Sequence, residues 1–279
     1  MATQKKLNIV IFGATGSIGY FTLKKFYENN HNLLLFIKNN KKIKFLKKKF
    51  KPSNLQTIKF ENLDILDKKS LKKKIDKNKN FIKKANLIIN AIGDQGQIGN
   101  FFKLDLKKFD KTFKINFFSQ IFLLRNIYKF IKKNKDTLII LFAGGGVTSV
   151  RRNFSSYSLS KIASVKLSEI LSQEFNNKNI RINSISPGVI DSKMTRSVLD
   201  KKKFLDKKEI VKLKKGILDS KKSLNKVYNL INFLMSEKGK FVSGKIISSR
   251  WDAFENWKKK EIKKIKNTDI FTLRRNINL

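Results

Sequence analysis

Tyr157 and Lys161 stand four residues apart in the stretch Phe154–Lys161, at the start of an apolar-periodic segment. On a helix, this spacing places both side chains on one face, one turn apart. A phenol alone has a pKa near ~10, and a neighbouring ammonium stabilises the phenolate and lowers that pKa. The pair could therefore pass a proton to or from a carbonyl or alcohol oxygen. The alternative is an ordinary surface tyrosine and lysine, because this spacing arises by chance in a lysine-rich chain.

A glycine-rich turn follows the first apolar strand, residues 7–12, and precedes a helical pattern that continues to Tyr27. Its glycines have the spacing G-x-x-G-x-x-G. Gly13 permits a tight turn, Gly16 lets backbone N–H groups approach a pyrophosphate, and Gly19 allows close packing of helix and strand. Strand, turn and helix in this order predict a dinucleotide site, and the alternative is a connector without a ligand. The residues expected to contact the dinucleotide are Gly13, Thr15, Gly16, Ser17, Ile18 and Gly19.

A cation stands at the end of the second apolar strand, residues 33–37. An acidic residue at this place binds the ribose hydroxyls of NAD, whereas a cation suits the 2′-phosphate of NADP. Lys38 therefore favours NADP(H) over NAD(H), unless it is only another surface lysine. A turn at residues 62–65 follows the third expected strand, and it could hold the adenine through Asp64 and Ile65.

One asparagine stands in unusually apolar surroundings. A buried strand that ends at Gly93 is expected over residues 87–93, and a long helix over residues 104–131. Within that helix Asn116 lies among several phenylalanines. An asparagine in such surroundings needs hydrogen-bond partners, so Asn116 is either functional or a satisfied structural group.

Strands alternate with helices over most of the chain. Further strands are expected at residues 55–60, 138–142, 180–185 and 241–248, and further helices at 68–79, 157–175 and 224–235. This alternation predicts a Rossmann-like, doubly wound parallel α/β sheet in a single three-layer domain. We assign residues 1–250 to this domain and residues 251–279 to a C-terminal extension. Residues 192–220 are charged and weakly patterned, as expected of a mobile substrate lid.

The composition excludes several classes of site. The chain has 279 residues, no cysteine and no apolar run long enough to span a membrane. Disulfides and zinc–thiolate sites are therefore excluded, and no metal is expected. Residues 1–6 lead into a strand without the layout of a signal peptide. These features predict a soluble, cytoplasmic protein without a membrane partner.

The net charge of +42 suggests a nucleic-acid partner at first sight. Only eight of the 63 basic residues are arginines, and the 55 lysines are spread over nearly every expected helix. Lysine is a flexible point charge rather than a planar phosphate ligand. It is abundant here together with Asn, Ile and Phe, all of which have A/T-rich codons. A genomic base bias is therefore a sufficient cause of the charge, and no specific nucleic-acid partner is expected.

The motifs occur in a recognisable order. Over residues 7–250 the chain resembles the short-chain dehydrogenase/reductase family, as an atypical member. The resemblance implies a seven-stranded domain, a nicotinamide cofactor and a homodimer or homotetramer. It rests on the glycine turn, Asn90-Ala91-Ile92-Gly93, Asn116, Tyr157-x-x-x-Lys161 and Ser186-Pro187-Gly188-Val189.

The resemblance also implies roles for single residues. Tyr157 would be the general acid/base, and Lys161 would bind the nicotinamide ribose and depress the pKa of the tyrosine. Asn116 would hold a water molecule in a proton relay. Two segments would contact the cofactor as well, namely Asn90, Ala91 and Gly93 in one, and Pro187, Gly188 and Val189 in the other.

Two departures from the family pattern stand out. The glycine spacing is that of the extended branch or of some atypical members. The substrate-binding serine of the family, about thirteen residues before the tyrosine, is replaced by Gly144. Thr148 and Ser149 are the nearest hydroxyls upstream of Tyr157, and either could replace the serine if the loop folds back. Loss of one oxyanion donor lowers the rate ~10²–10³-fold in other enzymes.

We therefore expect an NAD(P)-dependent oxidoreductase that moves a hydride between the nicotinamide and a small-molecule carbonyl or alcohol substrate. Tyr157 would supply or remove the proton on the substrate oxygen. A dinucleotide-binding sensor or scaffold with little turnover is the alternative, motivated by Gly144. A nucleic-acid-binding protein is a third hypothesis, motivated by charge alone.

Overall fold

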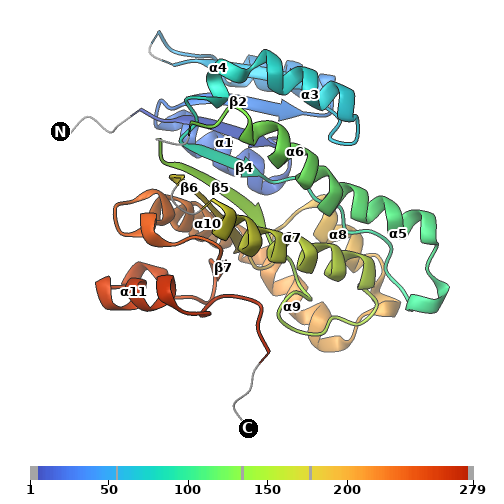
Figure 1. The fold of residues 1–279 in the computed structure, drawn as a ribbon. Helices are drawn as coiled ribbons and strands as arrows, with labels where there is room; N and C mark the ends of the chain where they lie inside the picture. The colour runs from blue at the N-terminus through green and yellow to red at the C-terminus, as the bar shows by residue number, and fades with distance from the viewer. Residues whose placement is uncertain (1–5, 55, 133–134, 176–177, 276–279) are drawn as a thin grey trace.

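Seven parallel strands form one central sheet in the computed structural model, which describes residues 6–54, 56–132, 135–175 and 178–275 (Figure 1). The strand order is β3-β2-β1-β4-β5-β6-β7, and every neighbouring pair is parallel. This order confirms the doubly wound, Rossmann-like fold expected from the sequence. The strands are β1 (Asn8–Phe12), β2 (Asn32–Ile37), β3 (Ile58–Asn62), β4 (Leu87–Asn90), β5 (Thr137–Phe142), β6 (Ile180–Ser186) and β7 (Ile246–Ser248).

Helices cover both faces of the sheet, so the strands are apolar on both faces (Figure 1). Along β1, Ile9 and Ile11 enter one core, whereas Val10 and Phe12 enter the other. One layer contains α1 (Ser17–Glu28), α2 (Asn40–Lys49) and α10 (Ser220–Met235). The opposite layer contains α3 (Lys68–Lys77), α4 (Lys79–Ile82), α6 (Ser119–Tyr128) and α7 (Ser155–Glu174). The carboxyl ends of all strands meet at one edge, which is where ligands bind in sheets of this class.

Three strands differ from the sequence prediction. The strand predicted at residues 87–93 is β4 and already ends at Asn90. The third strand, predicted at residues 55–60, begins at Ile58 and ends at Asn62, and Leu55 lies outside the described residues. The last strand, predicted at residues 241–248, includes only Ile246–Ser248. Gly244 has a φ of +74°, a left-handed conformation that an extended strand cannot contain. The residues before it form a short 3₁₀ turn, η4 (Gly239–Phe241).

The long helix predicted at residues 104–131 is interrupted. It consists of α5 (Leu106–Phe113), a π-helical turn η2 (Lys114–Phe118) and α6, which ends at Tyr128. A separate 3₁₀ turn, η1 (Phe101–Lys103), precedes it. The helix starts later than predicted because Asp105 caps α5 by accepting a hydrogen bond from the Lys107 N–H (2.8 Å). Asn116 lies inside the π turn, a feature often found at functional sites.

The segment predicted as a mobile lid, residues 192–220, is helical and packed. It contains α8 (Lys193–Leu199), a 3₁₀ turn η3 (Lys202–Phe204) and α9 (Lys207–Leu218). Ser192 and Asp206 cap α8 and α9 with their side chains. Val198 of α8 and Leu213 of α9 are buried beside Phe154, which directly precedes α7. Residues 192–220 therefore pack over the start of α7.

The tail from residue 251 is part of the fold as far as Arg275, and residues 276–279 lie outside the described part of the chain. It contains η5 (Phe254–Asn256) and α11 (Lys259–Asn267), and it buries Trp257 against the layer of α1 and α10. Glu169 of α7 accepts hydrogen bonds from the Leu273 N–H (2.7 Å) and from Arg274 (2.8 Å). The sequence did not place this tail because lysines dominate α11 and leave only Ile262 and Ile265 as buried positions.

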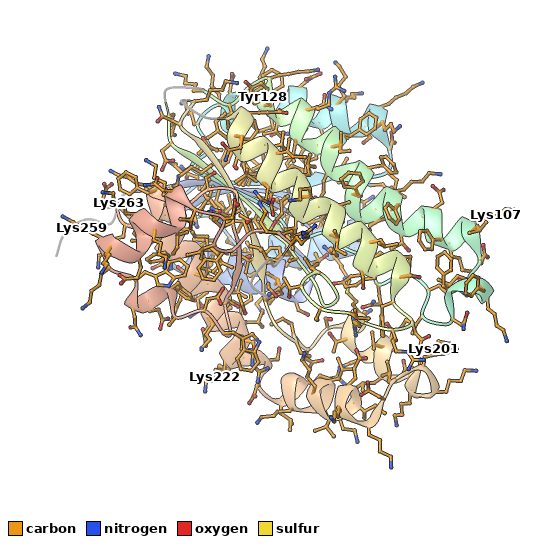
Figure 2. All side chains as sticks on the ribbon, turned by 60° about the horizontal axis from the view of Figure 1, so that its bottom comes forward. Lys107, Tyr128, Lys201, Lys222, Lys259 and Lys263 are labelled. Atoms are coloured by element: carbon orange, nitrogen blue, oxygen red, sulfur yellow. The ribbon has the colours of Figure 1, made fainter. Side chains whose placement is uncertain are left out.

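Lysine side chains project from many sides of the molecule (Figure 2). The labelled lysines belong to α5, α10, α11 and the turn before η3, so the positive charge is not gathered on one face. Among the residues that the structure describes, no helix is long and apolar enough to cross a membrane.

Candidate active site

The glycine turn joins β1 to α1 in a close-packed arrangement. Gly13 has a φ of +80°, and its carbonyl accepts a hydrogen bond from the Gly16 N–H (3.0 Å). A methyl group added at Gly19 would lie 2.3 Å from the Gly13 carbonyl oxygen. Only glycine therefore allows the helix and the strand to approach this closely, as the sequence predicted.

The amino terminus of α1 is open to an anionic ligand. Its N-cap is Gly16, no side chain caps it, and its first turn contains no acidic residue. Gly16 is exposed, and a methyl group there would have one close neighbour, the Gly13 carbonyl oxygen at 3.6 Å. Thr15, Ser17 and Ile18 are partly exposed around it. Uncapped N–H groups at the positive end of a helix dipole suit a pyrophosphate, so these residues fit a dinucleotide.

Lys38 and Asp64 follow the neighbouring strands β2 and β3 and form an ion pair of 2.7 Å. Burial would raise the pKa of the Asp64 carboxyl, but Lys38 and the Leu66 N–H hold that pKa below its ordinary value. Lys38 is 73% exposed, so its ammonium can exchange this carboxylate for another anion. Ile65 is buried beside Asp64. The structure thus brings the residues predicted for the adenosine end of the cofactor to one edge of the sheet.

The residues predicted for catalysis converge at the carboxyl ends of β4 and β5. A methyl group added at Gly93 would lie 3.5 Å from Lys161 Nζ and 3.7 Å from Asn116 Oδ1. Lys161 is buried and donates a hydrogen bond to the carbonyl of Phe142 at the end of β5 (2.9 Å). Tyr157, one turn earlier on α7, is buried as well. The alternative of a surface tyrosine and lysine is therefore excluded.

Tyr157 occupies the space that a side chain at position 144 would need. A methyl group added at Gly144 would lie 2.3 Å from the Tyr157 hydroxyl oxygen and 2.7 Å from two ring carbons. A serine therefore does not fit while the tyrosine keeps this position. Thr148 and Ser149, the two possible replacements, are both exposed. The loop thus does not bury either hydroxyl beside the tyrosine.

Burial governs the titration of the tyrosine–lysine pair. It lowers the pKa of Lys161 to about 8. It raises the pKa of Tyr157, and the positive charge of Arg151 opposes this increase in part. The sequence predicted a lowered tyrosine pKa. The prediction assigned that decrease to Lys161. In this structure the pKa is raised instead, because desolvation of the buried phenolate outweighs the attraction of Arg151.

Asn116 holds the loop that follows β4. Its Oδ1 accepts a hydrogen bond from the Asp94 N–H (2.8 Å), and its Nδ2 donates to the Asp94 carbonyl (2.8 Å) and to Ser160 Oγ (2.9 Å). Its own carbonyl accepts a hydrogen bond from Ser164 Oγ (3.0 Å). Both amide hydrogens are thus used within the protein, so Asn116 could bind a water molecule only through an oxygen.

The two other segments predicted to contact the cofactor follow β4 and β6. Asn90 is buried at the end of β4, and the N–H of Ala91 donates a hydrogen bond to a carbonyl of β1 (2.9 Å). After β6, Pro187 and Gly188 (φ +72°) lead to Val189. Val189 packs against α9, where a methyl group on the facing glycine would lie 2.3 Å from its Cβ. The segment predicted as a lid therefore touches a residue predicted to flank the nicotinamide.

Three residues that the sequence analysis did not single out also lie here. Met194 of α8 has its Cε 3.8 Å from the position of a methyl group on Gly93. Arg151, in the loop between β5 and α7, pairs with Glu209 of α9. The weak pattern of residues 192–220 gave no signal for Met194 or Glu209. One feature of the sequence could have drawn attention to Arg151, because arginine is rare in a chain whose usual cation is lysine.

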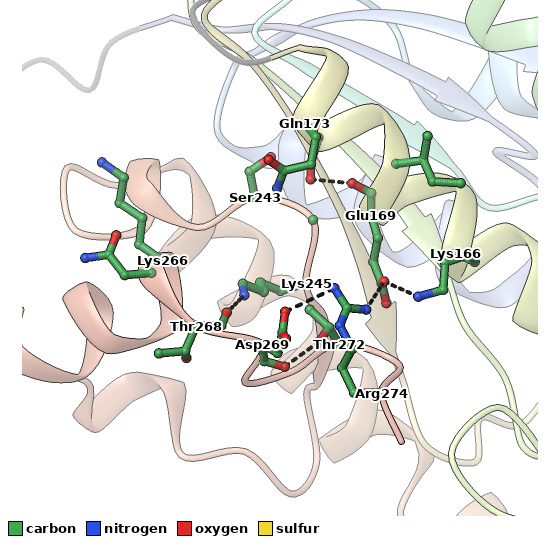
Figure 3. Close-up of a pocket in the computed structure, with 14 residues that line it drawn as sticks. Lys166, Glu169, Gln173, Ser243, Lys245, Lys266, Thr268, Asp269, Thr272 and Arg274 are labelled. Atoms are coloured by element: carbon green, nitrogen blue, oxygen red, sulfur yellow. Dashed lines mark hydrogen bonds and ion pairs between the residues drawn. The ribbon is translucent and has the colours of Figure 1, made fainter. Parts of the chain in front are cut away.

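A polar cavity of about 610 Å³ lies away from these residues, between the second half of α7 and the tail (Figure 3). Its charged side chains pair with one another, Glu169 with Lys166 and Arg274, and Asp269 with Arg274. None of the predicted site residues lines it. We therefore assign this cavity to anchoring of the tail.

A protein-family model and two relatives with known names match most of this chain. The family model described as enoyl-(acyl carrier protein) reductase matches residues 13–249. Dehydrogenase/reductase SDR family member 4 of Caenorhabditis elegans is 22% identical over 243 residues, which cover 85% of this chain and 91% of the relative. Post-translational flagellin modification protein A of Campylobacter coli is 25% identical over 260 residues, 87% of this chain and 97% of the relative.

Solved structures share the fold at low identity. A short-chain type dehydrogenase/reductase from Mycobacterium ulcerans has a TM-score of 0.74 at 17% identity, and the match covers 89% of both chains. The structure of ElxO with NADP bound has a TM-score of 0.71 at 21% identity, and the match covers 88% of this chain and 97% of that one.

Proposed function

Because the chain belongs to the short-chain dehydrogenase/reductase family, we propose that it is an NAD(P)-dependent oxidoreductase that interconverts a carbonyl and an alcohol. One observation carries the proposal: Tyr157, Lys161 and Asn116, from two separate helical segments, lie together at the end of β4 and β5. A positioned proton donor beside a dinucleotide turn is what such a reaction needs.

The binding roles follow from the positions of the side chains. The open amino terminus of α1 binds the pyrophosphate, and Lys38 binds the 2′-phosphate of NADP(H), the proposed preferred cofactor. ElxO, a structural relative, has NADP bound, and a 4-hydroxyisoleucine dehydrogenase mutant of the same fold has NADH bound. These relatives support a nicotinamide dinucleotide, and the proposed preference for NADP(H) rests on Lys38 alone. Lys161 donates a hydrogen bond to the nicotinamide ribose, between the segments 90–93 and 187–189. The bound nicotinamide supplies or accepts the hydride.

Tyr157 holds and moves the proton at the substrate oxygen. Its raised pKa keeps the phenol protonated at neutral pH, so carbonyl reduction is the favoured direction there. Lys161, with a pKa of about 8, can give up a proton near neutral pH and so reprotonate the phenolate after each reduction. Alcohol oxidation needs the phenolate, and its rate is expected to rise with pH.

A second candidate function is a dinucleotide-binding sensor or scaffold with little turnover. It is favoured by Gly144, because the hydroxyl that would share the substrate oxygen with Tyr157 is missing and the tyrosine fills its space. Removal of one such donor costs ~10²–10³ in rate, which leaves an enzyme slow but measurable.

A two-step experiment separates these functions. Titration with NADPH and NADH, followed by nicotinamide fluorescence, measures cofactor binding, and a panel of carbonyl compounds then measures oxidation of the bound cofactor. Saturable binding with turnover supports the oxidoreductase, and binding without turnover across the panel supports the sensor. If neither nucleotide binds, both functions are contradicted.

A further inference from the structure

An arginine–carboxylate pair joins the loop before α7 to the lid. Arg151 donates a hydrogen bond from Nε to Oε1 of Glu209 on α9 (2.7 Å), and its Nη2 forms an ion pair with the same oxygen (2.6 Å). Its guanidinium also stacks on the ring of Phe154, 3.5 Å from the ring centroid. Both charged side chains are largely buried, with 16% and 20% of their surface exposed.

The Arg151–Glu209 pair lies close to Tyr157, the proposed proton donor. Arg151 covers Gly145, and its Cδ is 3.4 Å from the position of a methyl group there. The preceding residue, Gly144, contacts the Tyr157 hydroxyl. The charge of Arg151 reaches the tyrosine, because it lowers the Tyr157 pKa against the larger effect of burial. An anion held by Arg151 would therefore lie close to a carbonyl that Tyr157 protonates.

The start of α7 has further capacity for an anion. No side-chain hydrogen bond caps this helix at its N-cap residue, Phe154, so the helix dipole there is not balanced by a capping side chain. The hydroxyls of Ser155 and Ser156 are buried without a hydrogen-bond partner among the described residues. Buried polar groups are normally satisfied, and exceptions point to a missing ligand or water.

Stability alone does not account for the pair. Burial of two charges costs desolvation free energy that their attraction often only balances, so apolar side chains would serve the fold equally well. The rest of α9 presents exposed lysines, including Lys207, Lys208 and Lys212. Glu209 instead turns inward to Arg151, and its helix packs against Phe154 and against Val189, a residue predicted to flank the nicotinamide.

We propose that Arg151 determines substrate specificity, and that it binds the carboxylate of an oxo-acid substrate in the place that Glu209 occupies. This inference rests on the proposed oxidoreductase function and names its substrate class. The planar guanidinium binds carboxylates through two parallel hydrogen bonds, and Glu209 acts as an internal substitute that the substrate displaces. The net charge of +42 raises the local concentration of anions.

The test compares oxo acids with their methyl esters, which keep the carbonyl and lose the charge. Binding of a panel of short- and medium-chain pairs to the NADP⁺-loaded protein is measured by calorimetry and ligand-observed NMR. We expect at least one acid to bind about tenfold more tightly than its ester, and Arg151→Met to remove that preference. Glu209→Gln, which keeps the shape of the side chain, should strengthen acid binding about tenfold and leave ester binding unchanged.

Arg152→Met is the matched control, because Arg152 is the exposed neighbour of Arg151 and its loss changes the net charge equally. It should leave the preference for acids intact, and Arg151→Lys should keep part of it. If Arg151→Met does not fold, Arg151→Lys and Glu209→Gln complete the test.

Equal binding of acids and esters in the wild type and in Glu209→Gln would overturn the inference, whatever the turnover. Turnover of the same compounds tests the proposed function separately. An acid that binds through Arg151 but is never reduced contradicts the oxidoreductase and leaves the carboxylate site standing.

Discussion

Gly144→Ser restores the hydroxyl that the family uses, and we expect it to lower activity rather than raise it. The added Cβ would lie 2.3 Å from the Tyr157 hydroxyl oxygen, far inside the ~3.5 Å at which such atoms are in contact. The phenol or the glycine loop must therefore shift by about 1 Å. Overpacking of this kind costs about 1–3 kcal/mol of folding free energy.

The expected losses in thermal stability and in rate follow from this displacement. For a chain of this size each kcal/mol lowers the Tm by about 2–4 °C. A catalytic group misplaced by about 1 Å loses ~10²-fold in rate, so kcat should fall by about that factor. The cofactor Kd should change little, because the glycine turn and Lys38 are on other strands.

Gly145→Ala is the matched control. Its methyl group would lie 3.4 Å from Arg151 Cδ, the start of ordinary van der Waals contact, so stability and kcat should stay close to wild type. Steady-state kinetics, fluorescence titration and thermal unfolding measure kcat, the cofactor Kd and the Tm of both variants. A Gly144→Ser protein as active as the wild type would refute the packing of Tyr157 against Gly144 in the reacting enzyme.

Three further predictions concern the cofactor site. Gly16→Asp should abolish nucleotide binding, because its carboxylate would meet the pyrophosphate. Gly16→Ala is the control, because there is room for its methyl group and the variant should fold and bind. Unchanged affinity in Gly16→Asp would contradict the assignment of the glycine turn as the pyrophosphate site. Lys38→Asp should weaken the binding of NADPH relative to that of NADH by at least about tenfold, since it places a second carboxylate beside Asp64. A wild-type protein that binds NADH more tightly than NADPH would contradict the proposed role of Lys38. Burial lowers the pKa of Lys161 to about 8. Cofactor affinity should therefore fall as the pH rises through that value, because the ammonium loses its proton. The affinity of Lys161→Met should not show this pH dependence.

The fold could be predicted because its signals are local. The apolar strand at residues 8–12, its glycine turn and the following helix are contiguous, and Tyr157 and Lys161 share a helix face through their spacing alone. The expected homodimer or homotetramer, the cytoplasmic location and the absence of a specific nucleic-acid partner stay predictions.

The remaining parts of the site depend on distances between remote segments. The contact of Tyr157 with Gly144 joins a helix to a loop thirteen residues away, and the raised tyrosine pKa depends on burial that no spacing reveals. Arg151 and Glu209 meet only because the lid folds back across 58 residues of chain. The short helices of that lid are set by their caps, whereas hydrophobic periodicity in this segment is weak.

Tyr157→Phe is the most direct test of proton transfer by the tyrosine. The variant keeps the ring packed against Gly144 and loses only the hydroxyl. We predict unchanged NADPH affinity in a fluorescence titration, together with a kcat lowered by ~10²–10⁴ on a substrate that the wild type reduces. Full activity of Tyr157→Phe on that substrate would contradict the mechanism, because the proton would then come from another group, such as Thr148 or Ser149.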